Sequence, residues 1–161
     1  MSTLVLEIRP GEMMIVNGAA IRFRTKTRLE LAARARFLFG KQIMPPEQAD
    51  SPARRVYFAL QTAYIGTDDE REGGLLDARR LIAEFQAATT SVMAREILER
   101  ALIAAESDDC YTALKFARRV IRHEDAVLGR APAPPYRAQV SGDRAEQAAD
   151  PAAAGAATAA G

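Results

Sequence analysis

Cysteine and histidine are almost absent from this sequence, because Cys110 and His123 are the only residues of their kinds among 161. A single thiol can form neither an internal disulfide framework nor a zinc site built from cysteines. The two residues also lie about three and a half turns apart along a predicted helix, which indicates no catalytic pair. We therefore interpret Cys110 as a small buried residue and His123 as a solvated one. The sequence predicts a protein of a reducing compartment that is not an enzyme.

Several other functional signals are also missing. No GxxxxGK[ST] or GxGxxG loop is present, so nucleotide binding through a glycine-rich cradle is not indicated. The acidic runs Asp68-Asp69-Glu70 and Asp108-Asp109 lack the alternating ligands of a calcium loop, and no metal or other cofactor is predicted. The first residues have no basic segment before a long apolar one, and no uncharged apolar run approaches the roughly 18 residues that span a bilayer. We expect a cytoplasmic protein with no signal peptide and no membrane association.

The C-terminal segment, residues 131–161, cannot contribute to a core. It contains 13 alanines and four prolines, and its only large apolar side chains are Tyr136 and Val140. Its proline-rich start favours extended polyproline II, and its end is low-complexity alanine interrupted by glycine. We predict a disordered tail, with a short alanine helix over 152–160 as the alternative. The rest of the chain is long enough for one domain, because hydrophobic residues make up 48% of the sequence.

Residues 1–50 show the two-residue period of β-strands. Leu4, Leu6 and Ile8 recur at every second position, and an Arg-Pro-Gly-Glu turn follows at 9–12. Asn17-Gly18 is typical of a type I′ hairpin turn, because both residues tolerate a positive φ. Further strands are predicted at residues 13–16, 19–25, 28–31 and 37–39. The pattern predicts a small antiparallel β meander.

Residues 51–130 change to a helical period. Ser51-Pro52 pairs an N-cap hydroxyl with proline at the first helical position, and this first helix should end near Gly66. An acidic loop ending in glycine, 68–74, is predicted to precede the second helix. The second helix is predicted at 75–87. Thr90-Ser91 should cap a third helix that ends before Ser107, and a fourth helix should start at Asp108-Asp109 and be closed by Gly129. The fold class is therefore α+β, with residues 1–50 and 51–130 as the two parts of a single domain.

Charge is distributed unevenly along the chain. Residues 1–60 contain 10 basic and 5 acidic residues, whereas residues 61–130 contain 10 basic and 13 acidic ones. Four cations alternate with other residues: Arg22, Arg24, Lys26 and Arg28. If this stretch is one strand, the four lie on one face about 6.6–7 Å apart, where they could follow a sugar–phosphate backbone. The alternative is a solvated outer face of an edge strand, kept charged to discourage edge-to-edge pairing.

Four more arginines extend the predicted RNA-binding set. Arg34 and Arg36 follow the stripe, and Arg54 and Arg55 begin the first predicted helix. Cations in a first helical turn oppose the helix dipole, and this small cost hints at another use. Pairing of Arg54 and Arg55 with Glu47 or Asp50 is an equal alternative to contact with nucleic acid.

The residues resemble a known family, the FlbT flagellar regulators of alphaproteobacteria. The most specific block is Ser-Pro-Ala-Arg-Arg-Val-Tyr-Phe-Ala-Leu-Gln at 51–61, and the resemblance covers roughly residues 4–128. Supporting blocks are LVLEIRPGE at 4–12, IVNGA at 15–19, YTALK at 111–115, RRVI at 118–121 and Glu124.

The resemblance implies a cytoplasmic post-transcriptional regulator that associates with the 5′ untranslated region of flagellin mRNA and promotes its decay. It also implies functional interplay with the flagellar regulator FlaF. It supplies no residue-level RNA site, so the basic stripe is a separate hypothesis from charge. An alternative is a protein–protein adaptor that binds flagellin or FlaF through its acidic helical half, with an indirect effect on mRNA. Assembly into a homo-oligomer stays open in either case.

Overall fold

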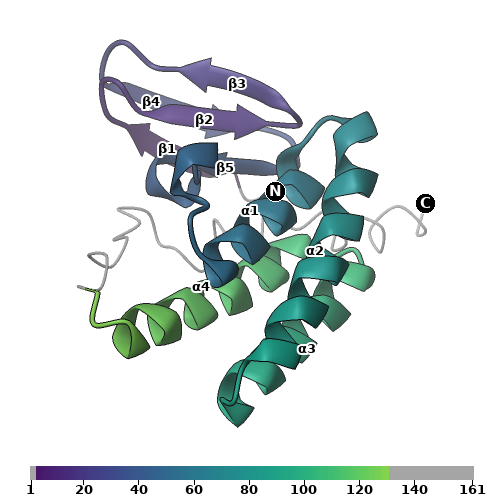
Figure 1. Cartoon of the computed structure of the whole chain (residues 1–161). Coiled ribbons are helices and arrows are strands. Elements are labelled where there is room, and N and C mark those ends of the chain that lie inside the picture. The colour runs from purple at the N-terminus through teal and green to yellow at the C-terminus, as the bar shows by residue number, and fades with distance from the viewer. Residues whose placement is uncertain (1–2, 131–161) are drawn as a thin grey trace. The chain divides into compact units, whose positions relative to one another are not determined.

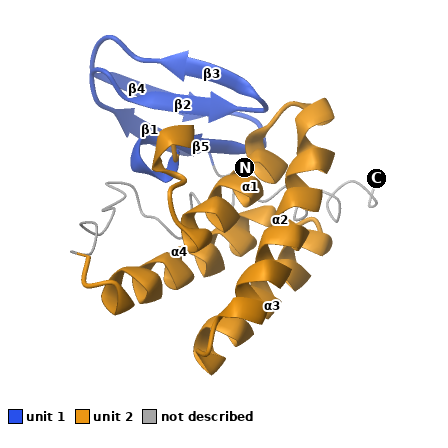
Figure 2. Cartoon of the chain, in the orientation of Figure 1, with its two compact units in different colours: residues 1–43, 136–161 blue, residues 44–135 orange. Residues whose placement is uncertain are grey.

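The computed structural model describes residues 3–130, which form two compact units divided in sequence between Ile43 and Met44 (Figure 2). We call residues 3–43 the β unit and residues 44–130 the helical unit. The division precedes the change in sequence period near residue 50. The helical unit begins before the first predicted helix because the side chain of Gln61 holds Met44. Gln61 accepts the Met44 N–H at 2.8 Å and donates to the Met44 carbonyl at 2.9 Å. The predicted α+β class is confirmed, and the predicted tail at 131–161 lies outside the described residues.

The β unit contains five short antiparallel strands in two sheets (Figure 1). One sheet pairs β1 with β4, and the other has the order β3-β2-β5. The strands are β1 (Leu4–Ile8), β2 (Met13–Val16), β3 (Ala19–Arg22), β4 (Thr27–Leu31) and β5 (Phe37–Phe39). The pairing differs from a sequential meander because β1 pairs with β4 rather than with β2.

The first four strands form one long hairpin that is interrupted in its middle. Leu4 pairs with Leu31, and Met13 pairs with Arg22, so both ladders keep one register about the same turn. That turn is Asn17-Gly18, where φ is 48° and 86°, which confirms the predicted positive-φ turn. The interruption takes four residues on each side, 9–12 and 23–26. A bend without a change of register lets the two halves form separate sheets.

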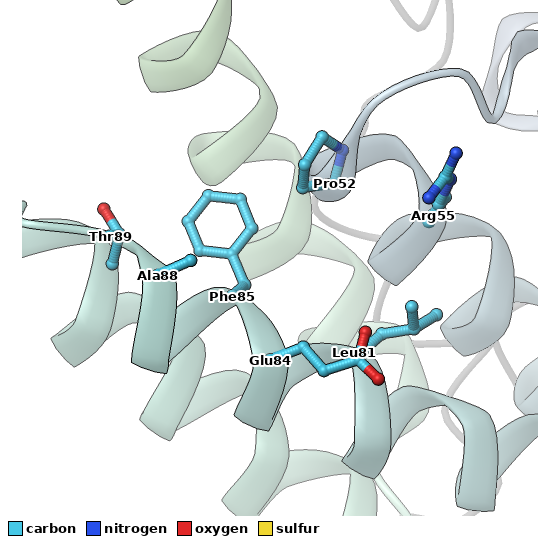
Figure 3. Close-up of a pocket in the computed structure, with 7 residues that line it drawn as sticks. All are labelled: Pro52, Arg55, Leu81, Glu84, Phe85, Ala88 and Thr89. Atoms are coloured by element: carbon cyan, nitrogen blue, oxygen red, sulfur yellow. The ribbon is translucent and has the colours of Figure 1, made fainter.

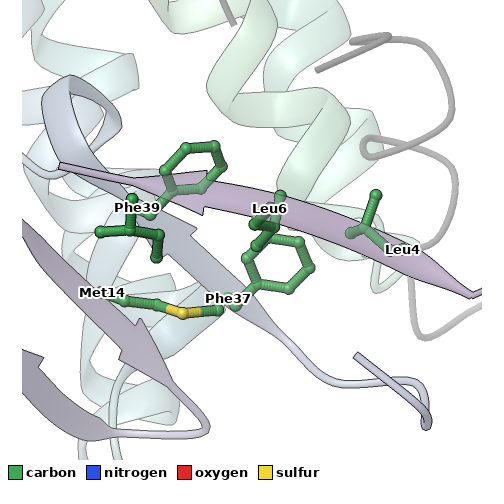
Figure 4. Packing of buried hydrophobic residues seen from close by; sticks show 6 residues of the cluster. Leu4, Leu6, Met14, Phe37 and Phe39 are labelled. Atoms are coloured by element: carbon green, nitrogen blue, oxygen red, sulfur yellow. The ribbon is translucent and has the colours of Figure 1, made fainter. Parts of the chain in front are cut away.

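The core of the β unit lies among side chains from both sheets (Figure 4). Leu4, Leu6 and Ile8 are buried on one face of β1, as the two-residue period predicts. They cluster with Met14 of β2 and with Phe37 and Phe39 of β5. Each large apolar side chain contributes about 1.5–3 kcal/mol when fully buried. Because these residues come from both ladders, the hairpin must bend for the core to form.

The helical unit contains four α-helices preceded by a short 3₁₀ turn, η2 (Pro46–Gln48). Ser51 accepts the Arg54 N–H at 3.3 Å and caps the first helix as predicted. Ser91 and Asp109 cap the third and fourth helices in the same way. The helices are α1 (Pro52–Ile65), α2 (Asp68–Ala88), α3 (Val92–Glu106) and α4 (Cys110–Val127). A further 3₁₀ turn, η1 (Gly40–Gln42), belongs to the β unit.

The second helix begins earlier than predicted. We expected a loop over 68–74 and a helix from residue 75, whereas α2 begins at Asp68. Thr67 and Glu70 form a capping box, in which the Thr67 N–H donates to the Glu70 carboxylate at 3.0 Å. The acidic residues of this segment therefore occupy the first helical turn, where carboxylates favour the positive end of the helix dipole. The glycines at 73 and 74 lie inside the helix.

The two helical glycines provide a matched test of this packing. A Cβ at Gly74 would lie 2.7 Å from the backbone nitrogen of Ala63 in α1, whereas a Cβ at Gly73 would meet nothing within 4 Å. Gly74→Ala should therefore lower the free energy of unfolding by about 1–3 kcal/mol through overpacking. Gly73→Ala should raise it by about 0.5–1 kcal/mol through helix propensity. Urea denaturation of both variants measures the difference, and equal effects would contradict the close α1–α2 approach.

Candidate nucleic-acid interface

The predicted basic stripe does not lie on one continuous strand. Arg22 ends β3, Arg24 lies in a bend, Lys26 precedes β4, and Arg28 lies within β4. The strand predicted over 19–25 is therefore confirmed only as far as Arg22, where β3 ends. The cause is the turn at 9–12, whose Gly11 N–H donates to the Phe23 carbonyl at 2.7 Å while the Glu12 carbonyl accepts the Phe23 N–H at 3.0 Å. The chain bends directly after these bonds.

The bend nevertheless collects exposed cations. The last pair of the β1–β4 ladder joins Ile8 to Thr27. Arg9 and Lys26 are the next residues beyond this pair, on the two opposite sides of the hairpin. Arg9 was not predicted from the sequence, because only the pairing register brings the 9–12 turn beside residues 23–26. We call these residues the bend cluster: Arg9, Arg22, Arg24, Lys26 and Arg28, all of them exposed.

The side chains of the bend cluster are not engaged with the protein itself. Within residues 3–130, none of the five makes a side-chain hydrogen bond or ion pair. Two carboxylates lie nearby: Glu7 is the cross-strand partner of Arg28, and Glu12 accepts the Arg9 backbone N–H at 2.8 Å. The β unit as described contains eight basic and three acidic residues, a net charge of +5. The bend therefore keeps an excess of positive charge that faces solvent.

Arg36 lies near the tip of the hairpin, away from the bend, and Arg34 lies two residues before it in the segment between β4 and β5. The Arg36 N–H donates to the Asn17 side chain at 3.0 Å, and the Arg36 carbonyl accepts the Asn17 N–H at 2.9 Å. Asn17 begins the turn, whereas Arg22 lies at the opposite end of β3, roughly 13 Å along the strand. The structure therefore places Arg36 at the opposite end of β3 from the bend cluster.

Arg54 is bound within the helical unit rather than presented to solvent. Its guanidinium nitrogens lie 2.9 and 3.1 Å from the two carboxylate oxygens of Asp125 in α4, and Asp125 is only 2% exposed. This hydrogen bond and the charge of Asp125 raise the pKa of Arg54 despite partial burial. The ion-pair alternative therefore describes Arg54 best, although its partner is neither Glu47 nor Asp50. Arg55 is exposed on the same helix.

Further contacts join α1 to α4. The Glu124 carboxylate accepts the Ala53 N–H at 2.8 Å, and Arg118 donates to the Tyr57 hydroxyl at 3.0 Å with its guanidinium 5.6 Å from the ring centre. Burial raises the pKa of Tyr57, and Arg118 opposes that effect. We call these contacts, with the Arg54–Asp125 pair, the α1–α4 clamp. They involve three residues of the SPARRVYFALQ block, Ala53, Arg54 and Tyr57, and both Arg118 and Glu124 of α4.

Cys110 and His123 both lie in α4. Cys110 is buried, as predicted, and His123 lies partly exposed on α4. Within residues 3–130, no three histidine, cysteine, aspartate or glutamate side chains gather as metal ligands. No helix in the same range is long and apolar enough to cross a membrane.

Comparison with known proteins identifies the family. Residues 4–128 match the family model described as flagellar protein FlbT. The chain belongs to the FlbT family. FlbT relatives include proteins of Mesorhizobium japonicum, 33% identical over 80% of this chain and 86% of the relative, and of Caulobacter sp. strain K31, 31% identical over 78% and 96%. Both are named "Probable flagellum biosynthesis repressor protein FlbT". No solved structure matches the chain.

Proposed function

We propose that this FlbT protein is a cytoplasmic, non-enzymatic repressor of flagellin synthesis. It binds the 5′ untranslated region of flagellin mRNA, here called the leader, and promotes degradation of the message. Family membership and the names of its relatives support a role in flagellar regulation. The observation that supports an RNA contact is the bend cluster, in which five exposed cations have no ion-pair partner among residues 3–130.

The chemistry of the bend cluster suits a phosphate backbone. Guanidinium groups bind phosphate in a bidentate manner and stack on exposed bases, which favours unpaired RNA. Contacts to phosphate position the chain on RNA but do not read its sequence. The helical unit, with 12 basic and 15 acidic residues in its described part, has a net charge of −3 and is a poorer surface for a polyanion. RNA should therefore engage the β unit.

Leader binding should weaken steeply with salt. If all five cations of the bend cluster contact phosphates, release of condensed counterions predicts about a 100-fold loss of affinity between 50 and 200 mM salt. Fluorescence anisotropy with a labelled leader measures the slope of the logarithm of the binding constant against the logarithm of the salt concentration. Lys26→Ala should make this slope shallower by about 0.7 because one phosphate contact is lost. An affinity that does not change with salt would contradict binding through the bend cluster.

A protein adaptor is the second candidate function, with flagellin or FlaF as the partner. The observation that favours it is a cavity in the helical unit, described below. Pull-down with purified flagellin, purified FlaF and leader RNA, each alone, separates the two functions. RNA captured in the absence of any protein partner supports direct binding, whereas RNA captured only together with a protein supports the adaptor.

A further inference from the structure

The helical unit has a cavity between the start of α1 and the second half of α2 (Figure 3). Its volume is about 340 Å³. Pro52 and Arg55 line it from α1, and Leu81, Phe85 and Ala88 line it from α2. We call this cavity the α1–α2 pocket. It is independent of the bend cluster, because all of its lining residues belong to the helical unit.

The floor of the α1–α2 pocket is apolar and open to solvent. Leu81 and Phe85 are only partly buried, and Ala88 and Pro52 are exposed. A ligand that covered these side chains would remove apolar surface from water, which is favourable by about 25 cal/mol per Å². The volume lies at the low end of the range for ligand sites, so it suits one large side chain better than a nucleotide.

The rim of the pocket carries one cation, Arg55, that makes no ion pair within residues 3–130. Arg55 is exposed, and its guanidinium makes no hydrogen bond or ion pair with any residue in the described range 3–130. The carboxylate that also lines the pocket, Glu84, already accepts a hydrogen bond from Arg80 at 2.9 Å. The first turn of α1 contains no acidic residue. The charge that complements this rim is therefore a carboxylate.

We propose that the α1–α2 pocket binds a short segment of a protein partner in which a large apolar side chain stands next to a carboxylate. The apolar side chain covers Leu81 and Phe85, and the carboxylate pairs with Arg55. A polyanion is a poor occupant because the helical unit carries a net charge of −3. This inference does not depend on RNA binding by the β unit.

Three blocked tetrapeptides test the proposal against the full chain by methyl and amide NMR. One contains Phe-Asp, one Phe-Asn and one Ala-Asp, each flanked by alanine. The Phe-Asp peptide should produce saturable shifts at the Leu81 and Ala88 methyl groups at millimolar concentration. The Phe-Asn peptide should bind about two- to fivefold more weakly, because an exposed ion pair contributes little, and the Ala-Asp peptide should bind more weakly still.

Two variants test whether Arg55 is the cation that pairs with the peptide carboxylate. Arg55→Gln should bring the Phe-Asp affinity down to that of Phe-Asn, whereas Arg100→Gln, at an exposed position of α3, should leave it unchanged. Circular dichroism confirms that both variants fold. The proposal is overturned if no peptide produces saturable shifts, if the shifts lie outside the pocket, or if Phe-Asp and Phe-Asn bind equally well to the unmodified protein.

Discussion

Replacing Arg22, Arg24 and Arg28 together by glutamate is expected to abolish binding of the flagellin leader. The substitutions change the net charge of the described β unit from +5 to −1. Three cation–phosphate contacts become repulsions, and at about 1.4 kcal/mol for each lost contact the affinity falls about 10³-fold. A gel-shift assay with the labelled leader at moderate salt measures the loss.

The variant should remain folded, because all three side chains are exposed and make no polar contact within residues 3–130. Surface substitutions of this kind change stability by about 0.5 kcal/mol or less each, and Arg28→Glu adds a destabilisation of about 0.2–1 kcal/mol because it places a glutamate opposite Glu7. The far-UV spectrum and thermal midpoint should therefore resemble those of the unmodified protein. Loss of RNA binding can then be assigned to charge at the bend.

A charge-matched control separates the bend cluster from general electrostatics. Arg100, Arg119 and Arg122 are exposed on helices of the other unit, and their replacement by glutamate alters the total charge equally. This control should retain most of the leader affinity. The RNA site is not the bend cluster if the bend variant still shifts the leader, or if the control loses as much affinity as the bend variant.

Local sequence signals predicted local structure well. Asn17-Gly18 forms the expected turn, and Ser51-Pro52 begins α1, because each feature depends on residues adjacent in the chain. The pairing of β1 with β4 was not predictable in this way, since strand period does not state which strands are partners. The start of α2 was missed because Gly73 and Gly74 suggested a loop, whereas Thr67 and Glu70 at capping-box spacing indicate a helix start.

In the candidate site, too, local features were predictable from the sequence and long-range contacts were not. The exposed cations at 22–28 were predicted, but their arrangement depends on hydrogen bonds between the 9–12 turn and Phe23. For Arg54 the sequence leaves RNA and the nearby acidic residues Glu47 and Asp50 as equal alternatives, whereas its ion-pair partner, Asp125, is 71 residues away. The charge pattern along the sequence therefore predicts where cations lie, but it does not predict which of them form ion pairs in the folded protein. Arg54 is separated from the cations of the bend cluster only by the packing of α1 against α4, which brings Asp125 to it.

Breaking the α1–α4 clamp is expected to lower the stability of the protein substantially. Asp125→Ala removes the carboxylate that faces Arg54, whose side chain is only 19% exposed. An uncompensated and largely buried cation costs about 3 kcal/mol, a large part of the 5–15 kcal/mol typical of a domain. We expect the thermal midpoint to fall by about 10 °C, measured by calorimetry or circular dichroism.

Asp77→Ala is the matched control, because Asp77 faces Arg80 at 3.6 Å with both side chains more than half exposed. It should change the free energy of unfolding by about 0.5 kcal/mol or less. The Arg54→Ala, Asp125→Ala double variant completes the test. It leaves no unpaired charge, so its destabilisation should be smaller than the sum of the two single variants. Additive effects, or equal losses in Asp125→Ala and Asp77→Ala, would show that the Arg54–Asp125 pair does not hold α1 against α4.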